Sequence, residues 1–146
     1  MFISINSRAA AAYKRVAADT SVQGADPHQL VSMLFDTLLQ SLVRARGALK
    51  TRDIAAKGAA IGKAVRILEE GLKAGLNMEQ GGELAQNLRA VYDYSILRLT
   101  QANLRNDDAA LAEVVALIEP VADSWKQIKA GGTSSVQPAS AGLVGA

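Results

Sequence analysis

Residues 26–50 have the sequence DPHQLVSMLFDTLLQSLVRARGALK, and this stretch decides the fold class. Asp26 is a preferred N-cap residue, and Pro27 is tolerated at the first helical position because its missing N–H needs no partner there. Apolar side chains then recur with a period near 3.6, at Leu30, Val31, Leu34, Phe35, Leu38, Leu42, Ala45 and Leu49. This pattern predicts an amphipathic helix that ends near Lys50 and buries one face.

Three further stretches have the same period, and short turn-forming segments at 51–53, 77–82 and 106–108 separate them. The second predicted helix buries Ile54, Ile61, Val65, Leu68, Leu72 and Leu76. The third buries Leu84, Leu88, Val91, Tyr92, Ser95, Leu99 and Ala102. The fourth buries Leu111, Val114, Val115, Ile118, Val121, Ala122, Trp125 and Ile128. Because the connections are short, we predict an all-α fold, an antiparallel up-down four-helix bundle.

The predicted bundle spans residues 26–130. We expect residues 1–25 to form a flexible N-terminal segment with a short helix that caps the bundle, and the uncharged, Gly/Ser/Ala-rich residues 131–146 to form a disordered tail. Pro120 lies inside the fourth helix, where proline removes a hydrogen bond at a cost of about 3 kcal/mol. Because the apolar stripe continues in phase on both sides, we expect a kink near residues 116–120 rather than two helices.

Residues that carry most enzyme chemistry are scarce. The chain has no Cys and one His, His28, which we expect to face solvent near the end of the bundle. Glu69 and Glu70 are adjacent, so they point in different directions on a helix. A di-iron bundle would need Glu-x-x-His pairs on two helices, and the sequence has none. The sequence therefore predicts a non-enzymatic protein with no cofactor and no metal, whose work is binding.

Hydropathy and charge limit the cellular locations and the classes of partner that we expect for this protein. No apolar run approaches the roughly 20 residues that span a bilayer, and the N-terminus lacks the apolar core of a signal peptide. We therefore expect a cytoplasmic protein that does not insert into membranes. Between Arg44 and Lys73, eight Lys or Arg accompany three acids, so a nucleic-acid binder is an alternative. Without stacking aromatics or a known motif, ordinary solvated faces and no nucleic-acid partner are favoured.

Two helices carry apolar or small residues beyond their core stripe. On the third helix these are Ala90, Leu97 and Leu104, flanked by Tyr94 and Thr100. On the second helix we expect the following to lie opposite the core face: Ala56, Ala60, Ile67, Gly71 and Ala74. Scattered exposed Ala and Leu are normal, whereas a contiguous strip marks a groove for an apolar partner helix. The same strips are suited to weak pairing of two copies of the chain.

Asn103 of the third helix has two interpretations. As a residue at or near the core face, it would make an internal hydrogen bond. Alternatively, it would present its amide group to the backbone of a partner.

Several segments, in this order and at these spacings, resemble the flagellin-specific export chaperones of the FliS family. The segments are Ala12-Tyr13, DPHQLVSMLFD at 26–36, DIAAKG at 53–58, GKA at 62–64, GGELAQNL at 81–88, VYDY at 91–94, RLTQAN at 98–103 and Trp125. The resemblance runs from about Tyr13 to Ile128. Two features depart from the family pattern: a longer stretch between Tyr13 and Asp26, and Pro120 in a helix interior.

The resemblance implies a partner and a mechanism. Members of the family hold the C-terminal region of newly made flagellin in the cytoplasm, prevent its premature polymerisation and present it to a component of the flagellar export gate. In the family, the N-terminal segment covers part of the flagellin site until flagellin arrives, a role that would fall here on Tyr13 and Val16. A different class of function, a regulatory adaptor that binds another flagellar or secretion protein, is the alternative.

Overall fold

The computed structural model describes residues 26–128, and all its regular elements are helices. They are α2 (Pro27–Lys50), α3 (Ile54–Arg66), the π-helix η1 (Ile67–Lys73), α4 (Gly82–Arg105) and α5 (Asp108–Gln127). The all-α prediction is confirmed. The expectations for residues 1–25, including Tyr13 and Val16, and for the tail at 131–146 lie outside the described residues.

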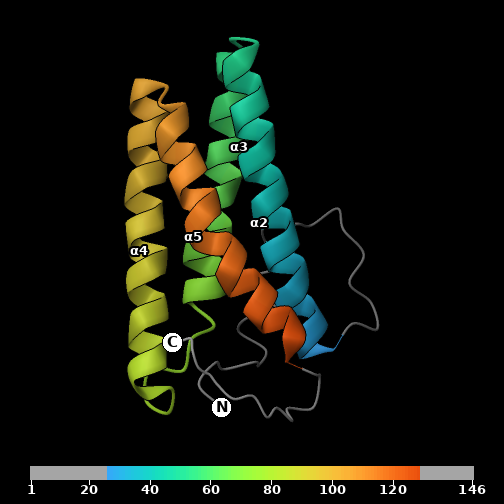
Figure 1. Ribbon diagram of the computed structural model, residues 1–146, viewed down its shortest axis with the longest axis vertical. Coiled ribbons are helices and arrows are strands. Elements are labelled where there is room, and N and C mark those ends of the chain that lie inside the picture. The colour runs from blue at the N-terminus through green and yellow to red at the C-terminus, as the bar shows by residue number, and fades with distance from the viewer. Residues whose placement is uncertain (1–25, 129–146) are drawn as a thin grey trace.

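The helices lie side by side with short connections between them. Followed by its colours in Figure 1, the chain runs up α2, back down α3 and η1, up α4 and down α5. Helix α2 packs against α3, η1 and α5, whereas α4 packs against α5, α3 and η1. The α3–η1 segment therefore has a packed neighbour on two sides.

Polar side chains fix the points at which α2, α3 and α5 begin. The Asp26 carboxylate accepts a hydrogen bond from the Gln29 backbone N–H at 2.8 Å, and the Gln29 side chain accepts one from the Asp26 N–H at 3.1 Å. This reciprocal pair is a capping box, which satisfies two backbone donors that the helix leaves unpaired. Asp53 caps α3 through the Ala56 N–H at 3.0 Å, and Asp107 caps α5 in the same way.

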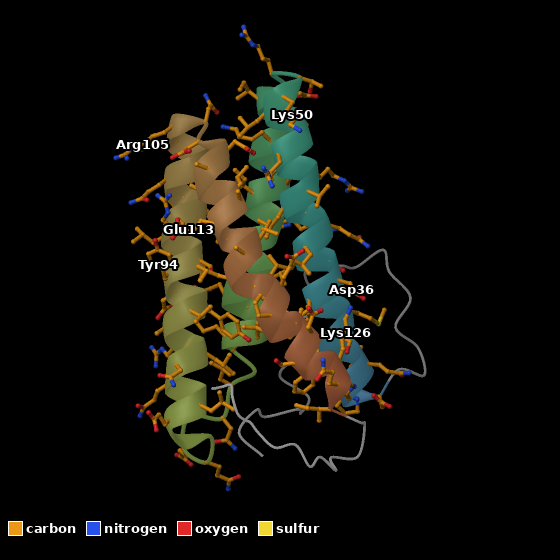
Figure 2. The ribbon with its side chains drawn as sticks, in the orientation of Figure 1. Asp36, Lys50, Tyr94, Arg105, Glu113 and Lys126 are labelled. Atoms are coloured by element: carbon orange, nitrogen blue, oxygen red, sulfur yellow. The ribbon has the colours of Figure 1, made fainter. Side chains whose placement is uncertain are left out.

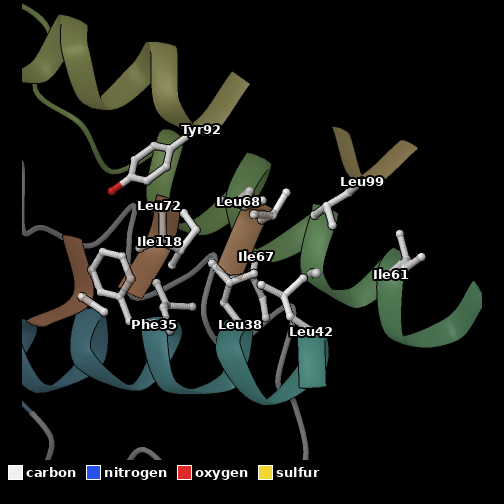
Figure 3. Packing of buried hydrophobic residues seen from close by; sticks show 14 of the residues in the cluster. Phe35, Leu38, Leu42, Ile61, Ile67, Leu68, Leu72, Tyr92, Leu99 and Ile118 are labelled. Carbon is white, nitrogen blue, oxygen red and sulfur yellow. The ribbon is translucent and has the colours of Figure 1, made fainter. Parts of the chain in front are cut away.

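The bundle interior is filled by aliphatic side chains with one large aromatic residue from each of three helices. Figure 3 shows labelled side chains from α2, α3, η1, α4 and α5 meeting in one cluster. Most of the predicted core is buried, including Phe35, Tyr92 and Trp125. The prediction was wrong for Ile54 and Leu84, because 52% and 42% of their respective surfaces are exposed. Each lies in the first turn of its helix, where the neighbouring helices no longer cover it.

The second helix departs most from the prediction. It is α-helical only to Arg66 and then becomes η1, where we expected one continuous α-helix. Ala60, Ile67 and Gly71, which we placed opposite the core face, are buried, and Ile67 is 0% exposed. The reason is the position of this segment between α2 and α4, which buries both of its flanks and leaves only a narrow outer edge.

Gly71 shows how closely the helices approach there. A Cβ atom added at Gly71 would lie 3.1 Å and 3.2 Å from the two methyl carbons of Leu34, which is itself buried. The absence of a side chain lets η1 approach α2 closely. Ala74, the last residue of the expected strip, is half-buried.

Helix α5 runs through Pro120 without interruption, as the in-phase stripe predicted. Pro120 is exposed, so its ring lies on the outer side of the bundle. A kink at residues 116–120 stays a prediction.

We expected His28 to face solvent, but it is half-buried and stacks on Trp125. The two ring centroids are 4.7 Å apart and the planes differ by 16°. His28 Nε2 donates to the Trp125 carbonyl oxygen at 2.9 Å, and Trp125 Nε1 donates to the His28 carbonyl oxygen at 3.2 Å. Near this contact Lys126 also pairs with Asp36, and both are labelled in Figure 2. The start of α2 is thereby fastened to the end of α5.

Candidate partner-binding surface

Helix α4 keeps one apolar face outside the bundle. Leu97 and Leu104 are 53% and 79% exposed, and Ala90 and Tyr94 are exposed as well. At about 100° per residue these four side chains share one side of the helix, away from the buried Tyr92 and Leu99 side. We call Ala90, Tyr94, Leu97 and Leu104 the α4 strip.

The structure brings together only part of the predicted site. The α4 strip is exposed as the sequence predicted, whereas Ala60, Ile67 and Gly71 belong to the interior and offer nothing to a partner. Ala74 is half-buried and directly follows the end of η1. The candidate surface is therefore centred on α4 rather than spread over two helices.

A polar network holds the α4 strip against α5. The Tyr94 hydroxyl donates to one Glu113 oxygen at 2.6 Å, and Arg98 Nε donates to the other at 2.7 Å. Arg98 also donates to the Gln101 side chain at 2.7 Å. The hydrogen bonds that Glu113 accepts from Tyr94 and Arg98 hold the pKa of its carboxyl below its usual range, and the bond from Tyr94 is the larger cause. The same bond raises the pKa of Tyr94. In Figure 2 the label of Glu113, which belongs to α5, lies just above that of Tyr94 beside α4.

A buried lysine, which the sequence analysis did not single out, fixes the end of α4. Lys57 of α3 is 3% exposed, and its ammonium donates to the Asn103 carbonyl oxygen at 2.8 Å and to Asn106 Oδ1 at 2.6 Å. Asn106 has a left-handed backbone, with φ at 54°, and ends the helix. A cation at a helix C-terminus also complements the helix dipole. The sequence signal for this burial was available, because Lys57 is in phase with Ala60, Ile61 and Ala64.

The middle of α4 is held by a second lysine. Lys73 of η1 pairs with Asp93 at 2.6 Å and with Glu69 at 3.5 Å, and Asp93 also lies 3.8 Å from Arg89. The hydrogen bond that Lys73 donates to Asp93 is the main reason why the pKa of Lys73 is raised. Lys57 and Lys73 thus attach α4 to the α3–η1 segment at two levels.

Asn103 is exposed, not core-facing as one interpretation required. Its backbone carbonyl accepts the Lys57 bond. A Cβ atom added at Gly58 would lie 3.9 Å from Asn103 Oδ1, so the amide group lies beside the bare backbone of α3. This position suits the alternative interpretation, in which the amide meets a partner.

Within residues 26–128, no helix is long and apolar enough to cross a membrane.

Comparison with known proteins identifies relatives over most of the chain. Residues 9–132 match the model of a family described as flagellar protein FliS. A Salmonella typhimurium protein named flagellar secretion chaperone FliS is 53% identical over 117 residues, which cover 80% of this chain and 87% of the relative. A protein of the same name from Escherichia coli K12 is 45% identical over 116 residues, covering 80% and 85%. Flagellar secretion chaperone FliSB of Pseudomonas aeruginosa is 43% identical over 116 residues, covering 80% and 91%.

Proposed function

The chain belongs to the FliS family of flagellar proteins, and from this premise we propose that it holds the C-terminal region of flagellin for export. FliS is a family of chaperones, so the protein is a flagellar export chaperone and not an enzyme. In this proposal it acts in the cytoplasm, keeps flagellin from polymerising early and delivers it to a component of the export gate.

The exposed α4 strip is the observation that supports this proposal. Its leucines remain in contact with water although the bundle interior is already filled by other side chains. Contiguous exposed apolar surface usually marks an interaction site, and an amphipathic helix is the usual occupant. A cargo segment that folds on binding covers a large surface at modest affinity, which suits temporary protection before export.

The side chains around the strip define the expected contacts. Leu97 and Leu104 would take the apolar face of the cargo helix, and the aromatic ring of Tyr94 would border it. The exposed Asn103 amide lies on the α3 side of α4, away from the strip, so it would bond to cargo backbone that passes over that side. Tyr13 and Val16 of the N-terminal segment would cover part of this surface in the empty chaperone, and the cargo would displace them.

The test is a calorimetric titration of a flagellin C-terminal peptide into the full-length protein. We expect binding with a negative heat-capacity change, because apolar surface is buried. The variant Leu97→Asp should weaken binding at least tenfold with unchanged helicity. The matched control is Val43→Asp, because Val43 is 66% exposed but lies on α2. Absence of peptide binding at tens of micromolar would refute the proposal, and equal losses in both variants would refute the α4 strip as the site. Binding to another secretion protein alone would favour the regulatory adaptor.

A further inference from the structure

One end of the bundle combines free cations with exposed aliphatic side chains. It is formed by the turn between α2 and α3 and the turn between α4 and α5, and Lys50 and Arg105 mark it in Figure 2. The two turns lie together, because Lys57 in the first turn of α3 binds Asn106. Ile54 is 52% exposed at this end. We call Lys50, Arg52, Ile54 and Arg105 the basic turn surface.

The acids at this end are already engaged. Asp53 and Asp107 accept backbone N–H groups as helix caps, and Asp108 pairs with Arg46 through two bonds of 2.8 Å and 3.0 Å. By contrast, the exposed side chains of Lys50, Arg52 and Arg105 have no hydrogen bond or ion pair with any residue in 26–128. Arg52 and Arg105 therefore present their positive charge to solvent, whereas Lys50 also attracts the Asp108 carboxylate through space and, after the hydrogen bond from Arg46, helps to lower its pKa.

Helix dipoles explain part of this pattern but not all of it. Lys50 and Arg105 stand in the last turns of α2 and α4, where cations are favoured for stability alone. Arg52 is different, because it lies between helices with φ at 59°. Residues with a side chain rarely adopt this left-handed backbone, and Gly, Asn and Asp do so most readily. An arginine that bears this strain without a partner points to a use for its side chain outside the bundle.

We infer that the basic turn surface docks an acidic segment of another protein that also carries aliphatic side chains. The cations supply charge complementarity and fix the position of the bound segment, and Ile54 supplies the apolar contact. The surface lies at the end of the bundle, whereas the α4 strip extends along its side, so a second partner can bind while flagellin is held. Leu104 borders both surfaces, and for that reason the tests use other residues.

The test measures fluorescence anisotropy of a labelled 18-residue peptide with Leu at helical spacing and Glu elsewhere, added to the full-length protein. Two matched peptides carry Lys in place of Glu, or Ser in place of Leu. We expect the acidic amphipathic peptide alone to bind, with an affinity that falls as salt rises. Equal binding of the Lys peptide, or equal binding of the Ser peptide, would overturn the inference.

Variants of Arg52 separate a binding role from a structural one. Arg52→Asn keeps a residue that tolerates the left-handed backbone, so thermal stability should be unchanged or higher while affinity falls about fivefold. Arg52→Lys keeps the charge and should retain affinity within about twofold. Arg66→Gln is the control, because Arg66 is an exposed cation farther along α3. An equal loss of affinity in the control would show that only net charge matters and would overturn the inference.

Two further experiments distinguish the possible partners. A 20-nucleotide single-stranded DNA that competes with the peptide at equal concentration would assign the surface to nucleic acid instead. Leu97→Asp should leave the acidic peptide bound, and Arg52→Asn should leave the flagellin peptide bound. Loss of peptide binding at one surface can therefore be detected without loss of binding at the other. If each variant lost both peptides, the two surfaces would not be separate.

Discussion

The α3–η1 segment and helix α4 carry similar sequence patterns and have opposite positions in the bundle. Each has small or aliphatic residues on a second side of the helix, beyond its core stripe. In α3–η1 that side is buried, because α2 and α4 pack on either side of it. In α4 that side remains exposed, because no described helix covers it. A second apolar side is therefore available to a partner only where no neighbouring helix packs over it.

The sharpest test of this comparison substitutes one residue from each helix. Ile67→Asp places a charge in a fully buried position and should cost more than about 4 kcal/mol of unfolding free energy, enough to unfold the protein. Leu97→Asp leaves its charge in water and should cost less than about 1 kcal/mol, mostly through helix propensity. Urea denaturation followed by circular dichroism measures both. Similar losses for the two variants would mean that α4 is covered after all.

A second prediction concerns the attachment of α4 to α3. Lys57→Met keeps most of the apolar stem but removes both donors to Asn103 and Asn106, and it should cost about 1–3 kcal/mol of stability. Lys63→Met on the same helix is the control and should stay within about 0.5 kcal/mol. Both values come from urea unfolding curves. If Lys57→Met is as stable as the wild type, the lysine is not what fixes the end of α4.

Substitutions of two glycines test the difference between a buried and an exposed helix surface. Gly71→Ala forces a methyl group against the buried Leu34 and should destabilise by about 1 kcal/mol, after the gain in helix propensity is subtracted. Gly47→Ala on α2 meets no atom within 4 Å and should stabilise by about 0.5–1 kcal/mol. Thermal unfolding gives both signs. A stabilising Gly71→Ala would show that Leu34 can move aside and that the approach is loose.

The smallest expected effect concerns the hydrogen bonds of Tyr94 and Arg98 to Glu113, beside the α4 strip. Because the folded-state pKa of Glu113 is depressed, its contribution to stability is present above the unfolded-state pKa near 4.5 and is lost as pH falls through the folded value. In Tyr94→Phe the Glu113 pKa should rise, since the largest cause of its depression is gone. Carboxyl carbon NMR titration of the two proteins measures this. An unchanged pKa would mean that Arg98 alone holds the carboxylate.

Local signals were enough to predict the helices and their limits. Asp26 was predicted as a cap, 51–53 and 106–108 were predicted as turns, and the spacing of leucines identified four helical segments. The π-helical turn at 67–73 was not predictable in this way, because its residues continue the helical period of α3.

The candidate site was predicted in part. The exposure of Leu97 and Leu104 was predicted correctly, because at about 100° per residue they point well away from the Tyr92 side of α4. Ile67 was misplaced, because it is adjacent to Leu68 and so flanks the core face instead of opposing it. The partners of Lys57 and Trp125 lie 46 to 97 residues away in the sequence, and no local pattern indicates such contacts.

The reciprocal contact between His28 and Trp125 has a topological consequence. It brings the first turn of the first described helix to the last turn of the final one, so residues 26 and 128 lie at the same end of the bundle. A short peptide linker joining them would close the chain into a ring without crossing any helix. New termini opened at the turn of Thr51 and Arg52 would then give a circular permutant with the same interior.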